Sequence, residues 1–189
     1  MSKRTLFLIF ALFIITFVLL MVALYNPNVK PTTTQTTPIP KEEVAQTVLS
    51  FGSTNIATSS SVASLKYSVP INISTGKNKV TAVQLEMQYD PQVITKVTVV
   101  PGPFFTKPEV LLEQIDEKTG RITYAFGSGL TEPSVVGQGI VANLTFEAKA
   151  TPLQTTIISF LPKTLVTAEG INQSVLKQTN DIQIIIGEK

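Results

Sequence analysis

A strict alternation of apolar and polar residues is the feature of this chain that most restricts its fold. The side chains of a β-strand point to opposite faces in turn, so this period of two predicts strands with one buried face and one solvated face. The clearest example is residues 80–89, where Val83, Leu85, Met87 and Tyr89 alternate with Gln84, Glu86 and Gln88. The three polar side chains are therefore expected to point to water.

Nine segments have this strand character: residues 66–74, 80–89, 95–100, 110–115, 121–126, 139–150, 155–161, 164–168 and 181–186. Residues 116–120 between two of them end in Gly and predict a hairpin loop. Pro70 inside the first segment predicts an edge strand or a bulge. Two weak helical patterns, residues 42–49 and 169–177, are interpreted as the approach to a strand and as a loop. The sequence thus predicts an all-β protein, a single β-sandwich of jelly-roll topology with about nine strands.

The residues before the predicted sandwich form three further parts. Residues 6–25 carry no charge, and twenty residues at about 1.5 Å each span roughly 30 Å, the thickness of the hydrocarbon core. Residues 5–25 are therefore predicted to be one transmembrane helix, an uncleaved signal-anchor, after a cytoplasmic tip of residues 1–4. A cleavable signal peptide is the alternative, although the end of the apolar run offers a poor cleavage site.

The flanking residues predict where the domain lies. Lys3 and Arg4 precede the apolar run, and this positive charge favours a cytoplasmic amino terminus. Residues 26–46 are rich in Pro and Thr, a composition typical of an extended stalk. Residues 47–187 would then form an extracellular domain at the cell membrane.

The composition excludes several classes of function. The chain has no His and no Cys, so imidazole or thiolate catalysis and thiolate metal sites are excluded. The residues after position 43 carry eleven basic and eleven acidic groups, which leaves no positive surplus for binding nucleic acid. Two carboxylate pairs, Asp116 with Glu117 and Glu109 with Glu113, have the residue types of a glycosidase. The hairpin pair is more simply a solvated turn, so we predict a protein that is not an enzyme, with no catalytic or metal-binding residues.

The sequence resembles the cohesin domain, the receptor module of cellulosome scaffolds, because several short motifs occur in the order found in that family. Tyr89-Asp90-Pro91 ends a strand, Val93-Ile94 follows, and Pro101-Gly102 comes next. In the second half, GRITYAFGSG resembles the central strand of the family and GQGIVANLTFEAKA its glycine-led strand. The resemblance covers roughly residues 48–187 and implies a flattened nine-stranded sandwich without catalytic activity.

The resemblance also implies a partner. Cohesins bind dockerins, calcium-loaded helical modules on partner enzymes, through one sheet face. It implies that the partner carries a dockerin-like module, that calcium belongs to the partner, and that this chain needs no cofactor. The residues expected on the partner-binding face are Gln84, Glu86, Gln88, Thr123 and Ala125.

Other interpretations remain open at this level. Phe104 and Phe105 follow Pro103 in a loop and predict either a cap on one end of the sandwich or exposed loop contacts for a partner. A carbohydrate-binding module for extracellular polysaccharide has a similar architecture and is the alternative function. A structural domain without a ligand is a third possibility.

Overall fold

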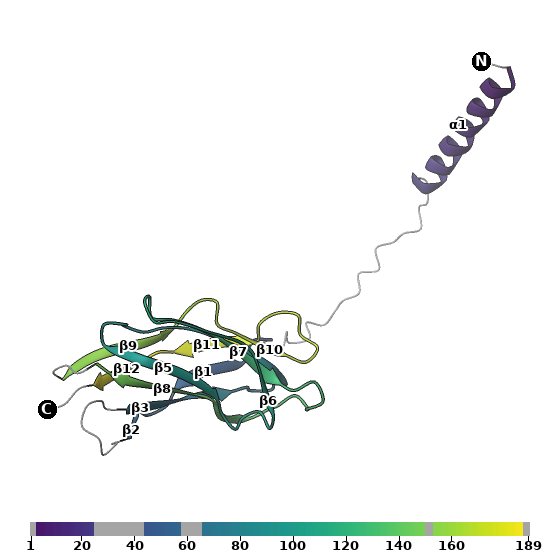
Figure 1. Ribbon diagram of the computed structural model, residues 1–189. Coiled ribbons are helices and arrows are strands. Elements are labelled where there is room, and N and C mark those ends of the chain that lie inside the picture. The colour runs from purple at the N-terminus through teal and green to yellow at the C-terminus, as the bar shows by residue number, and fades with distance from the viewer. Residues whose placement is uncertain (1–2, 25–43, 58–65, 150–152, 187–189) are drawn as a thin grey trace. The chain divides into compact units, whose positions relative to one another are not determined.

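The computed structural model describes residues 3–24, 44–57, 66–149 and 153–186 (Figure 1). The chain divides into two compact units, Met1–Lys41 and Glu42–Lys189. The first unit contains the helix α1 (Lys3–Leu24). The stalk predicted at residues 26–46 lies mostly outside the described residues.

The predicted transmembrane helix at residues 5–25 is not supported by the structure. Among the described residues, no helix combines the length and the hydropathy needed to cross a bilayer.

The second unit is a sandwich of two six-stranded sheets. The strands are β1 (Thr47–Phe51), β2 (Asn55–Ala57), β3 (Lys66–Ser74), β4 (Val80–Gln88), β5 (Ile94–Pro101), β6 (Pro108–Asp116), β7 (Arg121–Ser128), β8 (Gln138–Ala148), β9 (Gln154–Phe160), β10 (Leu165–Ala168), β11 (Leu176–Asn180) and β12 (Ile182–Ile186). Sheet A has the order β11-β1-β3-β8-β5, with β2 also paired to β3, and sheet B has the order β12-β9-β4-β7-β6, with β10 also paired to β4 (Figure 1). The prediction of an all-β sandwich is confirmed.

All nine predicted strands are present, and the structure adds β1, β2 and β11. The weak pattern at residues 169–177 predicts a loop, but its end belongs to β11, which pairs with β1 in parallel. After Leu176 the residues of β11 are polar and mostly exposed, so they lack the alternation that marks the other strands. Most connections cross from one sheet to the other, as expected of a jelly roll.

The core lies between the sheets and consists of the apolar set of each alternating strand. On β4, Val83, Leu85 and Met87 are buried, and Tyr89 directly after the strand is buried too, as predicted. Tyr67 on β3 stacks on Phe146 of β8 with ring centroids 5.4 Å apart. Because the chain contains no Cys, this apolar core, without disulfides, stabilises the domain.

Pro70 lies in a central strand and not at the edge of a sheet, so that half of the prediction is wrong. β3 pairs with β8 along its whole length, but its other side is shared by two short strands. β1 pairs with residues 71–74 and β2 with residues 66–68. Pro70 falls in the gap between them, where its missing N–H costs no ladder hydrogen bond. A register shift follows it, between Ile71 and Asn72.

The last two strands of the domain lie in different sheets. β11 pairs with β1 in sheet A, and β12 pairs with β9 in sheet B. Only Asp181 separates them, and its carboxylate accepts a hydrogen bond of 2.9 Å from the backbone N–H of Phe160 at the end of β9. This contact fixes the point where the chain passes from one sheet to the other.

The burial pattern predicts that the same substitution, Leu to Ala, affects the free energy of unfolding strongly at one position and weakly at another. Leu85 is completely buried on β4, whereas Leu112 on β6 is 44% exposed. Leu85→Ala should lower the free energy of unfolding by about 2–5 kcal/mol, because it leaves a cavity. Leu112→Ala should change it by less than about 0.5 kcal/mol. Urea unfolding of both variants is the measurement, and equal losses would mean that the assigned inner and outer faces of sheet B are wrong.

Candidate partner-binding face

The residues predicted to bind a partner lie together on the outer face of sheet B. In the register of β4, β7 and β6, three rows of residues cross this surface, which we call the β4–β7–β6 face. The rows are Gln84–Ala125–Leu112, Glu86–Thr123–Gln114 and Gln88–Arg121–Asp116. The structure thus brings Gln84, Glu86, Gln88, Thr123 and Ala125 onto one surface, as predicted.

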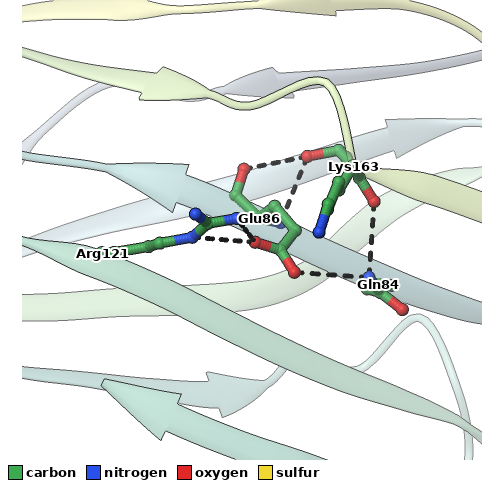
Figure 2. A network of polar contacts seen from close by, with 5 residues as sticks. Gln84, Glu86, Arg121 and Lys163 are labelled. Carbon is green, nitrogen blue, oxygen red and sulfur yellow. Dashed lines mark hydrogen bonds and ion pairs between the residues drawn. The ribbon is translucent and has the colours of Figure 1, made fainter. Parts of the chain in front are cut away.

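Glu86 does not point freely to water, which corrects the prediction for that residue. It is only 4% exposed, and its Oε2 lies 2.9 Å from Nη2 and 3.3 Å from Nε of Arg121 on β7 (Figure 2). A buried carboxylate needs a charged or hydrogen-bonding partner, and Arg121 supplies both. Glu86 is therefore a structural part of the face whose charge is neutralised by the neighbouring strand.

A bulge formed by residues 161–164 covers Glu86. β9 and β10 both pair with β4, at residues 87–88 and at residues 80–84, so four residues between them oppose only two on β4. The Thr164 hydroxyl donates to the Glu86 carbonyl at 2.9 Å and accepts from the Glu86 N–H at 3.1 Å. The Gln84 amide lies 3.4 Å from the Lys163 carbonyl (Figure 2). The bulge thus satisfies the Glu86 backbone with the Thr164 hydroxyl and with a hydrogen bond of 2.7 Å from the Leu161 N–H.

Gln88 and Asp116 hold the hairpin at the end of the face. The Gln88 amide donates to the Thr119 carbonyl at 2.6 Å. The Asp116 carboxylate accepts hydrogen bonds from the Thr119 hydroxyl and from the N–H groups of Lys118 and Thr119, and these bonds lower its pKa. Asp116 is thus occupied in the turn, which agrees with the interpretation of the hairpin carboxylates as a turn and not as a catalytic pair.

Phe104 and Phe105 are buried, so the hypothesis of exposed loop contacts is wrong and the hypothesis of a cap is confirmed. Phe105 is almost fully buried and packs edge-on against Phe126 of β7, with ring centroids 6.0 Å apart. Phe104 packs edge-on against Phe105 at 5.0 Å. The pair closes the core between the sheets and is not available to a partner.

The sequence did not single out the leucines of β6. Leu112 lies in the row with Gln84 and Ala125, and its neighbour Leu111 is 69% exposed. The segment Val110-Leu111-Leu112 departs from alternation, and a run of exposed apolar residues on a strand is the signal that could have pointed to this surface.

The other sequence-based candidates find little support in the structure. Tyr67, Tyr89 and Tyr124 are buried, and no Phe of the described sandwich is among its exposed apolar side chains. A planar aromatic platform for polysaccharide is therefore not formed by these residues. Within the described ranges, no group of three or more acidic side chains is placed to hold a metal ion.

Comparison with known proteins agrees with the fold. The family model of the cohesin domain matches residues 53–186, and the chain belongs to this family. No curated protein matches the chain.

Several solved structures share the fold. A cohesin from Clostridium acetobutylicum, determined in solution, is 19% identical, with 76% of this chain and 92% of that chain covered and a TM-score of 0.56. A type I cohesin–dockerin complex from Clostridium thermocellum is 13% identical, with coverage of 76% and 94% and a TM-score of 0.57. A cohesin from Acetivibrio cellulolyticus in complex with a dockerin is 17% identical, with coverage of 76% and 100% and a TM-score of 0.56.

The Glu86–Arg121 pair predicts a measurable stability effect. Arg121→Gln should lower the free energy of unfolding by about 1–3 kcal/mol, because it leaves the buried carboxylate with a weaker partner. Adding Glu86→Gln to this variant should restore much of the loss, because two amides need no charge compensation. Chemical unfolding of the two single variants and the double variant gives the coupling. Additive losses would show that the two side chains do not interact.

Proposed function

We propose that the domain is a receptor that binds a dockerin-like module of a partner protein through the β4–β7–β6 face. The observation that carries this proposal is the row Gln84–Ala125–Leu112, which offers a neutral amide, a small side chain and an apolar side chain on three adjacent strands. The ion pair with Arg121 neutralises the buried charge of Glu86 in the adjacent row. A neutral, firmly held sheet surface of this kind suits the desolvated centre of a protein interface.

Family membership and the neighbouring structures support a binding role. The complexes from Clostridium thermocellum and Acetivibrio cellulolyticus contain a dockerin bound to a cohesin. Cohesins are binding modules, which favours a binding role for this chain over catalysis. The burial of the tyrosines leaves the polysaccharide alternative without a specific observation in its favour.

Binding through this face can be tested with one substitution on each sheet. Ala125→Arg places a long cation at the centre of the face and should weaken capture of a dockerin module at least about 30-fold. Thr145→Arg is the matched control, because Thr145 is also half-buried and lies on the central strand β8 of sheet A. Surface plasmon resonance with immobilised full-length chain and a panel of calcium-loaded dockerin modules, including those of the two related complexes, gives the affinities.

The control variant and the removal of calcium distinguish the possible results of this binding experiment. The control variant should bind like the wild-type chain, and removal of calcium should abolish capture, since metal binding and module folding are coupled. A wild-type chain that captures no module of the panel would contradict the proposed function. Equal weakening by both arginine substitutions would exclude the β4–β7–β6 face as the site.

We further propose that the domain is displayed outside the cell and held at the membrane by residues 5–25. This proposal rests on the sequence alone, namely the uncharged residues 6–25 preceded by Lys3 and Arg4. Protein isolated from the membrane fraction of the producing cell should then give an intact amino-terminal peptide by mass spectrometry. A mature amino terminus near Asn26, or recovery of the protein in the cytosol, would contradict it.

A further inference from the structure

The strand β12 forms an edge of sheet B that lacks the usual protection against pairing with another chain. Among the described strands it pairs only with β9, and its ladder to β9 runs through all five residues without a register shift. Its sequence, Ile182–Ile186, contains no charge and no proline. An edge strand presents unpaired N–H and C=O groups, and a regular apolar edge without charge, proline or a bulge is a template for a further strand.

The strands at the other ends of the two sheets carry such protection. β6, at the opposite edge of sheet B, contains a register shift together with Glu109 and Glu113. In sheet A, β5 contains a register shift between Thr95 and Thr98 and ends in a proline. β11 carries Lys177 at the register shift in its pairing with β1. Of these four edge strands, β12 alone is regular and uncharged, so it is the edge best suited to pairing.

The outer side of this edge also exposes apolar side chains that the sandwich does not cover. Ile185 on β12 is 63% exposed, and Ile157 on β9 is 57% exposed. Gln183, which lies opposite Ile157, is the other exposed residue of β12, whereas Ile184 and Ile186 are buried toward the core. Exposed isoleucines gain little from folding, since their apolar surface stays in water. A strand added to β12 would cover part of this surface.

We propose that two copies of this chain associate by antiparallel pairing of β12 with β12, so that sheet B continues from one copy into the other. The alternation of β12 determines the register, because directly opposite residues of an antiparallel pair lie on the same face. A twofold axis at Ile184 meets this condition and pairs all five residues: Ile182 with Ile186, Gln183 with Ile185, and Ile184 with its own copy. A shift by one residue is excluded, because it would place exposed residues opposite buried ones.

This pairing leaves the β4–β7–β6 face free, since β12 and β6 are opposite edges of sheet B. Because the paired residues share a face, the twofold axis is perpendicular to the sheet, and the outer faces of both copies point to the same side. Two such faces on one assembly would give avidity toward a partner that carries two binding modules. The association itself is independent of the proposed function, because only contacts at the β12 edge produce it.

Introduced cysteines test the register directly, because the chain has none of its own. Gln183→Cys with Ile185→Cys places thiols of the two copies opposite each other, with Cα atoms about 4.5–5.5 Å apart, which a disulfide can bridge. Mild oxidation of this full-length variant should therefore give a covalent dimer. Thr155→Cys with Ile157→Cys is the matched control on the exposed side of β9, one strand further in, and should stay uncrosslinked. Equal cross-linking of both variants, or none in either, would overturn the inference.

Sedimentation equilibrium of the full-length chain in mild detergent measures the strength of the association. Ile185→Lys should weaken it at least about tenfold, because two cross-strand pairs with Gln183 are lost and the edge becomes charged. Val100→Lys is the matched control, since Val100 is 55% exposed on the edge strand β5 of sheet A, and it should associate like the wild-type chain. A monomeric wild-type chain, or equal association of the Ile185→Lys variant and the wild-type chain, would overturn the inference. Neither measurement uses a dockerin module, so its failure is distinguishable from failure of the proposed function.

Discussion

The two hydrogen bonds between Thr164 and the backbone of Glu86 hold together the part of sheet B on which most of its strands depend. β4 is the strand to which β7, β9 and β10 are all paired. Between β9 and β10 the chain has two residues too many for a regular ladder. The Thr164 hydroxyl accepts from the Glu86 N–H at that point, and the Glu86 C=O accepts from both this hydroxyl and the Leu161 N–H. β12 depends on the same arrangement, since it pairs with β9 alone among the described strands.

The same bulge determines the chemistry of the outer surface. By covering Glu86, it makes an exposed carboxylate into a buried one, which in turn requires Arg121 on the neighbouring strand. The centre of the β4–β7–β6 face is consequently neutral, and charged side chains lie around it, on β6, on its hairpin and at Lys163 beside Gln84. On such a surface the neutral centre can supply affinity, because it is easily desolvated. The surrounding charges can supply selectivity, because they act on a partner at a distance.

Local alternation was sufficient to predict the strands and the inner face of β4, since the period of two follows directly from strand geometry. It predicted Gln84 and Thr123 on one surface for the same reason. It could not predict the burial of Glu86, because the covering residues 161–164 lie far away in the sequence and their bulge is a tertiary feature. β11 was missed because its residues after Leu176 are all polar and so show no alternation. The exposure of Leu111 depends on the bulge in β6, which alternation alone does not reveal.

The parallel pairing of β1 and β11 has a mechanical consequence. Parallel neighbours run in the same direction, and β12 continues the chain onward from β11, so the domain is entered at the start of β1 and left at the end of β12. Tension applied between these two points loads the β1–β11 ladder along the strand direction. The hydrogen bonds of the ladder then share the load and must break together instead of opening one at a time. If a captured partner is pulled by flow, the paired strands β1 and β11 would resist the resulting shear.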